Sequence, residues 1–108
     1  TYTVDFAKNV KLILKEKLWG VYNLVCDGTT SRNEVAKEIL RITGLESKII
    51  LNTVGSEFWK KEYFAPRPYS EQLDSKKLKS INLYIMRDWK ICLKEYLEEY
   101  FNDRFIKK

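Results

Sequence analysis

A helix with signals at both of its ends lies between two runs of β-forming residues, and this arrangement constrains the fold more than any other part of the sequence. Ser31 and Glu34 have the S-x-x-E spacing of a capping box, and Gly44 suits the left-handed position beyond a helix end. Residues 21–26 and 48–54 have the length and composition of strands. A strand, a helix and a strand in this order predict a βαβ unit with two parallel strands.

Helical periodicity flanks this unit on both sides. The apolar positions predict a helix over residues 4–17, with Thr3 as its cap, Asp5 in its first turn and an apolar face formed by Phe6, Ala7, Val10, Ile13 and Leu14. A second amphipathic pattern predicts a closing helix over residues 86–101, and residues 75–78 can begin a short helix. Residues 102–108 are expected to fray.

The predicted fold class is therefore α/β. We expect a small single domain with a short parallel sheet from the βαβ unit, flanking helices and an amphipathic helix at its C-terminal end. With 108 residues and 44% apolar residues, the chain is long enough for one modest core and too short for two. The chain has no initiating Met, and its first residues are typical of a helix entry, so we expect a piece of a longer protein.

Charge and cysteine content restrict the possible partners only loosely. The formal net charge of +5 can attract nucleic acid, an anionic membrane or a phosphorylated small molecule, and it does not choose among them. No apolar run has the length of a membrane helix, so we expect no membrane partner. Cys26 and Cys92 stand alone among apolar residues, which favours buried thiols in a reducing cytoplasm over a disulfide.

The residue types that most enzymes need for catalysis are largely absent. The four glycines, at positions 20, 28, 44 and 55, cannot form a G-x-G-x-x-G loop, and the chain contains no His. No Tyr is followed by Lys four residues later. We therefore predict no catalytic residue, no cofactor-binding residue and no metal site in this chain.

Two segments are candidates for ligand contact. Pro66 and Pro68 stiffen the backbone around Arg67, whose guanidinium can bind a phosphate or carboxylate, although a structural ion pair remains the alternative. Residues 56–64 mix aromatic and basic side chains, as single-stranded nucleic-acid binders do. A short helical turn that packs its aromatic side chains against the domain is the alternative reading.

The order of these segments resembles that of a known family, the C-terminal part of dTDP-4-dehydrorhamnose reductase. The most specific pieces are Ala65-Pro-Arg-Pro-Tyr-Ser70 and Leu73-Asp-Ser-Lys-Lys-Leu78. Further matching segments follow the same order along the chain: residues 1–7, 20–24, 28–29, 33–39, 88–89 and 93–97. The resemblance covers nearly the whole chain.

The resemblance implies that residues 1–108 are the C-terminal substrate-binding domain of a reductase acting on a dTDP-sugar. NADPH or NADH would be bound by an N-terminal Rossmann domain absent from this chain, so the chain alone is predicted to be inactive. The resemblance implies Arg67 as a contact to the sugar-nucleotide pyrophosphate and Tyr2 as a contact at the domain seam. Another extended short-chain epimerase or dehydratase remains an alternative, as does a basic nucleic-acid-binding module.

Overall fold

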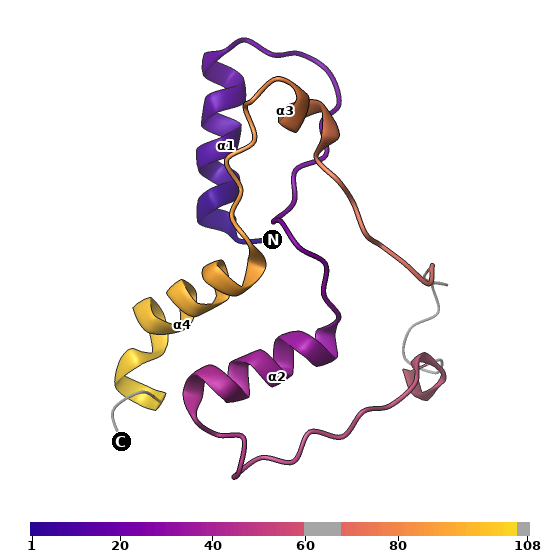
Figure 1. Cartoon of the computed structure of the whole chain (residues 1–108), viewed down its shortest axis with the longest axis vertical. Helices are drawn as coiled ribbons and strands as arrows, with labels where there is room; N and C mark the ends of the chain where they lie inside the picture. Colours follow the sequence, from indigo (N-terminus) through magenta and orange to yellow (C-terminus); the bar gives the residue numbers. More distant parts are fainter. Residues whose placement is uncertain (60–67, 106–108) are drawn as a thin grey trace. The chain divides into compact units, whose positions relative to one another are not determined.

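A computed structural model describes residues 1–59 and 68–105 of the chain (Figure 1). This part contains the helices α1 (Thr3–Lys15), α2 (Arg32–Thr43), α3 (Lys76–Ser80) and α4 (Trp89–Phe105), and the 3-10 helix η1 (Ser56–Trp59). The chain divides into two compact units. The first comprises Thr1–Thr29 and Leu73–Lys108, and the second comprises Thr30–Gln72.

The predicted α/β fold class is wrong, because no β-strand forms within residues 1–59 and 68–105. In this part of the chain the only bridge is a parallel one between Asp27 and Asp88. Residues 21–26 are extended and lie next to the segment that leads into α4. Residues 48–54, the other predicted strand, are exposed and form no strand. A parallel strand needs a continued ladder of hydrogen bonds, and one bridge does not supply it.

Side chains of α1 supply hydrogen bonds that a neighbouring strand would otherwise give to residues 83–88. The Asn9 amide nitrogen donates to the Leu83 carbonyl oxygen at 3.0 Å, and the Ile85 N–H donates to the Asn9 side-chain oxygen at 2.9 Å. Asn9 is fully buried, so both bonds satisfy groups that water does not reach. The segment therefore runs along α1 without forming a sheet (Figure 1).

Residues 21–27 are held by the same means. The Val25 N–H donates to the Ser75 hydroxyl at 3.3 Å, and the Tyr84 hydroxyl donates to the Val25 carbonyl oxygen at 2.9 Å. At the bridge, the Asp27 N–H donates to the Arg87 carbonyl oxygen at 3.1 Å. The backbone groups of residues 25 and 27 are thus paired with the Ser75 and Tyr84 side chains and with the backbone of the segment before α4.

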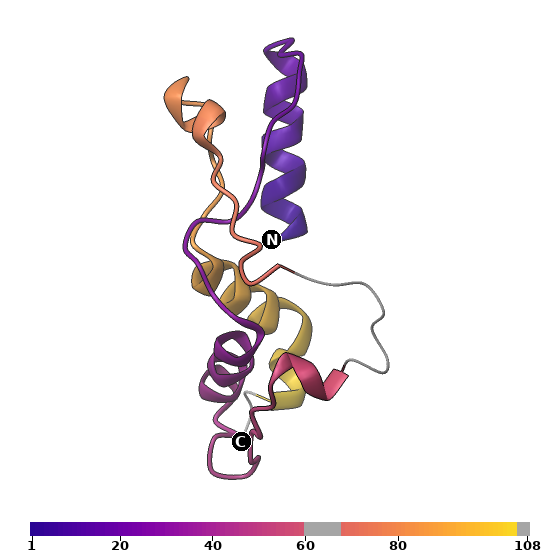
Figure 2. The ribbon, with the colours of Figure 1, turned by 90° about the vertical axis from the view of Figure 1, so that its right-hand side faces the viewer.

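Helix α1, the indigo and purple helix of Figure 2, departs from the prediction at its ends and on its buried face. Its cap position is Tyr2 and not Thr3, without a side-chain capping bond, and the helix ends at Lys15 because Lys17 adopts a left-handed φ of 51°. The most buried α1 residues are polar, Asp5 at 2% and Asn9 at 0% exposure. Phe6 and Leu14, which were predicted to be buried, are exposed.

Helix α2 follows the local signals of the sequence closely. The Glu34 N–H donates to the Ser31 hydroxyl at 3.2 Å, and the Ser31 N–H donates to the Glu34 carboxylate at 2.8 Å. This is the predicted capping box. The pKa of Glu34 is lowered because its charged carboxylate accepts the Ser31 N–H and also the Thr30 hydroxyl. Gly44 ends the helix with a φ of +67°, as predicted.

The other predicted helices are confirmed with shifted boundaries. Helix α3 forms at residues 76–80, and its Leu78 is fully buried. Helix α4 begins at Trp89 because Arg87 and Asp88 take part in the bridge with residue 27, and buried Met86 lies in the extended segment. Helix α4 continues to Phe105, so fraying from residue 102 is wrong as far as residue 105, and residues 106–108 lie outside the described part.

No helix in the described part of the chain combines the length and the apolar character that a membrane span requires.

Gly28 should be far more sensitive to substitution than Gly44. Both have a positive φ, but a Cβ at Gly28 would lie 2.8 Å from the Asp88 carboxylate and 3.0 Å from the Trp89 ring, whereas nothing lies within 4 Å at Gly44. We expect Gly28→Ala to lower the free energy of unfolding by about 2–5 kcal/mol and Gly44→Ala by only about 1–2 kcal/mol. Urea unfolding followed by circular dichroism measures both, and equal losses would contradict the predicted contact.

Candidate functional site

One arginine joins three elements of the first unit. The Arg87 guanidinium donates to Asp5 of α1 from Nε at 2.8 Å and from Nη2 at 2.9 Å, and to Glu95 of α4 from Nη1 at 2.5 Å and from Nη2 at 3.1 Å. We call these three residues the Arg87 cluster. The Asp5 side chain is 3% exposed and the Glu95 side chain is 40% exposed.

The charges of the Arg87 cluster form a structural ion-pair network. Hydrogen bonds from Arg87 lower the pKa of Asp5, against the effect of burial, and they lower the pKa of Glu95. The hydrogen bonds that Arg87 donates to Glu95 and to Asp5 raise the pKa of Arg87. Two carboxylates share one guanidinium, so the cluster has a net negative charge. It therefore offers no free cation to a phosphate group.

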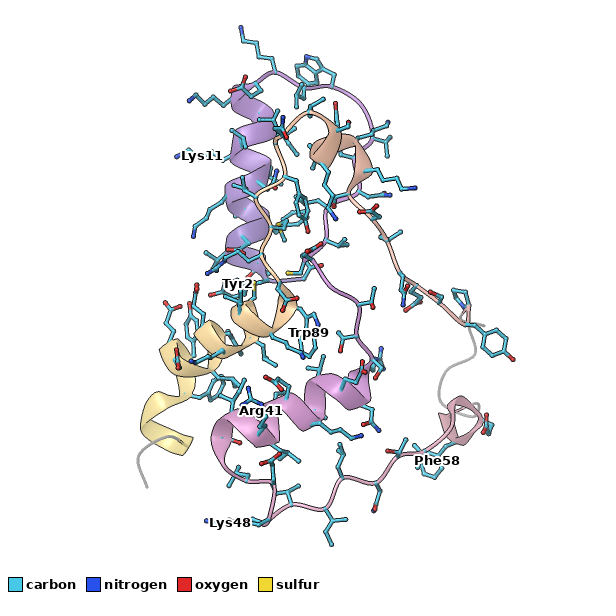
Figure 3. All side chains as sticks on the ribbon, viewed as in Figure 1. Tyr2, Lys11, Arg41, Lys48, Phe58 and Trp89 are labelled. Carbon is cyan, nitrogen blue, oxygen red and sulfur yellow. The ribbon has the colours of Figure 1, made fainter. Side chains whose placement is uncertain are left out.

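Tyr2, a predicted substrate contact, lies next to this cluster and is half-buried (Figure 3). Its N–H donates to the Cys26 sulfur at 3.2 Å, and its hydroxyl oxygen is buried with no hydrogen-bond partner in the described part of the chain. Burial raises the pKa of Tyr2, and the charges of Glu95 and Glu99 raise it further. The protonated hydroxyl can donate to a neutral acceptor, but these carboxylates make the position unfavourable for a pyrophosphate.

Arg67, the other predicted substrate contact, lies outside the described residues, as do Pro66 and residues 60–64 of the aromatic and basic segment. Pro68 and Tyr69 are described and exposed. Phe58 lies in η1, in agreement with a short helical turn, and it is 66% exposed. The predicted roles of Arg67 and Tyr2 in substrate binding therefore stay predictions.

The segment that follows Arg67 is anchored firmly at its C-terminal end. Lys79 Nζ lies 3.2 Å from the Asp27 carboxylate and 3.1 Å from the Asp74 carboxylate, and it stands over the Tyr84 ring at 4.8 Å. Ser75 is 2% exposed and accepts the hydrogen bond from Val25. The Leu73-Asp-Ser-Lys-Lys-Leu78 motif is thus a fixed end for the stretch that carries Arg67.

A family model described as the RmlD substrate binding domain matches residues 1–102. The chain belongs to this family. The RmlD domain is the substrate-binding domain of dTDP-4-dehydrorhamnose reductase-like extended short-chain dehydrogenases, so the resemblance seen in the sequence is confirmed. Its family consists of oxidoreductase-type enzymes that act on nucleotide sugars. No curated protein and no solved structure matches the chain.

Sequence reasoning missed the residues that tie this RmlD domain together. It placed Asp5 in the first turn of a helix, without a partner, and did not consider Asn9 or Arg87. A usable signal was present, because Asp5 and Asn9 share a stripe of α1 with Leu12 and Ile13, which are half-buried.

Both cysteines are free thiols, Cys92 buried as predicted and Cys26 half-buried. Within the described residues, no cluster of three or more potential ligands could hold a metal ion.

Removing the charge of Asp5 should destabilise the RmlD domain far more than removing that of Glu95. Both carboxylates bind the same guanidinium, but only Asp5 is buried. We expect Asp5→Asn to cost about 3–5 kcal/mol and the matched Glu95→Gln to cost about 1 kcal/mol or less. Urea unfolding of the two variants measures the difference. Similar losses of unfolding free energy would show that burial does not determine the strength of these ion pairs.

The RmlD domain should lose stability in acid. The folded-state pKa of Asp5 lies below its value in the unfolded chain, so its contribution is fully present above about pH 4 and is lost as the pH falls through the folded value. We expect the free energy of unfolding to fall below this pH and to fall less steeply in Asp5→Asn. Glu34 and Glu95 contribute with the same sign, so a smaller slope should remain. Denaturant unfolding across an acidic pH series measures both slopes.

Proposed function

We propose that this chain is the substrate-binding part of a dTDP-4-dehydrorhamnose reductase. The reaction is the reduction of the 4-keto group of dTDP-4-dehydro-L-rhamnose to dTDP-L-rhamnose with NADPH or NADH. The family match over residues 1–102 carries the proposal. The ordered succession of residues 65–70 and 73–78 supports it, since these are the segments most specific to the resemblance.

The residues of this chain do not fit a nicotinamide cofactor. Its glycines are too far apart to form the phosphate-binding turn of a Rossmann fold, and the chain has no Tyr-x-x-x-Lys pair. We therefore derive no chemical step within this chain. In the proposal, a separate Rossmann domain binds the cofactor, which supplies the hydride to the sugar carbonyl, and residues 1–108 position the sugar nucleotide.

Arg67 is the residue we propose for the pyrophosphate contact. A guanidinium between two prolines can neutralise phosphate charge from a stiff backbone, and this contact fixes the sugar relative to the hydride donor. The anchoring of residues 73–78 supports this role because it restricts where the preceding stretch can lie. For Tyr2 we propose a contact to a neutral oxygen of the ligand and not to phosphate, because Glu95 and Glu99 are close.

Kinetics of the full-length parent enzyme test this role of Arg67. We expect Arg67→Ala to raise the KM for dTDP-4-dehydro-L-rhamnose about 10–100-fold, the loss of one charged hydrogen-bonded contact, and Arg67→Lys to raise it less. Arg41→Ala is the matched control, because Arg41 is an exposed arginine paired with Glu38 of the same helix. An unchanged KM in Arg67→Ala would remove Arg67 from the site.

The nicotinamide balance of the same assay separates a reductase from the related epimerases. A reductase consumes one NADPH or NADH for each sugar product, whereas an epimerase shows no net oxidation of the cofactor. Net oxidation with formation of dTDP-L-rhamnose is the expected result. The isolated chain of residues 1–108 should show no turnover, and measurable turnover would contradict the proposed division between the two domains.

A further inference from the structure

Two cysteines far apart in the sequence meet beside the first turn of α1. The Cys26 sulfur accepts the Tyr2 N–H at 3.2 Å. The Cys92 sulfur lies 3.4 Å from the Asp5 carboxylate, to which its S–H donates. Tyr2 and Asp5 belong to the cap and the first turn of the same helix, so both thiols converge on one short stretch of α1.

The backbone next to the cysteines brings them to the same place independently. The Arg87 carbonyl oxygen accepts the N–H of Asp27, the residue after Cys26, at 3.1 Å, and it lies 4.0 Å from the Cys92 sulfur. Cys26 is also one of the groups that raise the pKa of Cys92, so the two side chains are close enough to interact. All of these residues belong to the first compact unit.

The two thiols differ in their access to solvent. Cys26 is half-buried, whereas Cys92 is 3% exposed. Burial, together with the hydrogen bond to Asp5, raises the pKa of Cys92 to about 12. Cys92 is therefore protonated at neutral pH, and a small oxidant in solution reaches Cys26 first.

We propose that Cys26 and Cys92 form an oxidation site that converts hydrogen peroxide into a disulfide within this chain. In the first step the Cys26 sulfur attacks one peroxide oxygen, the O–O bond breaks, and the products are Cys26 sulfenic acid and water. In the second step the Cys92 sulfur attacks the Cys26 sulfur and the S–O bond breaks. The hydroxide leaves with the Cys92 proton as a second water, and each cysteine has lost one hydrogen.

The disulfide would change the surroundings of the Arg87 cluster. It removes the S–H group that donates to Asp5, and it links the segment before the bridge at Asp27 covalently to α4. The hydrogen bonds from Arg87 to Asp5 do not involve sulfur and can remain. Oxidation therefore acts on the same elements that the cluster joins, without removing the cluster itself.

Mass spectrometry of the whole chain after treatment with hydrogen peroxide tests this proposal. We expect the main product to be a monomer lighter by two hydrogen atoms in which neither thiol can be alkylated. A tryptic digest should contain residues 18–32 joined to residues 91–94, and dithiothreitol should restore both free peptides. In Cys92→Ser, Cys26 should instead accumulate as a sulfenic acid that reacts with dimedone.

Several outcomes would overturn the proposal. These are oxidation of Cys26 in the native sequence to higher acids with no internal disulfide, disulfide-linked dimers as the main product, and no reaction of Cys26 at all. Treatment with diamide provides a second route to the same bond. If diamide also yields no internal disulfide in the folded chain, the two sulfurs do not meet as proposed.

Discussion

The bidentate pair between Arg87 and Asp5 is the interaction on which the first unit depends. A carboxylate that is 2% exposed needs a cation and hydrogen bonds to stay charged, and Arg87 supplies both while it also holds Glu95. The first turn of α1, the extended segment before α4 and α4 itself are joined through this one side chain. Loss of Asp5 or Arg87 therefore affects three elements at once.

Polar side chains make the hydrogen bonds to the extended segments that a β-sheet was expected to make. Asn9 pairs with the backbone of residues 83 and 85, and Ser75 and Tyr84 pair with the backbone at Val25. The largest fully buried side chains accordingly include two polar ones, Asn9 and Ser75, as well as Leu78. For the proposed function, this frame matters because it fixes residues 73–78, the end of the stretch that carries Arg67.

Local signals in the sequence predicted much of the secondary structure and little of the site. The capping box at Ser31 and the left-handed Gly44 formed as expected, because such signals act within one helical turn. The β-forming residues 21–26 adopt an extended conformation. A strand also needs a hydrogen-bonded partner in register, and such a partner has to come from a segment far away in the sequence. Motif order predicted the family correctly, whereas the proposed roles of Arg67 and Tyr2 remain predictions.

The sequence by itself determined where helices form, the order of family motifs and the absence of a G-x-G-x-x-G loop and of a Tyr-x-x-x-Lys pair. These properties depend on residues that are neighbours in the chain or on composition alone. Only the tertiary structure decided that Asp5 meets Arg87, that Asn9 takes the place of a strand partner and that Cys26 and Cys92 both lie beside the first turn of α1. Each of these pairs joins residues more than sixty positions apart, and no local pattern specifies which distant groups meet.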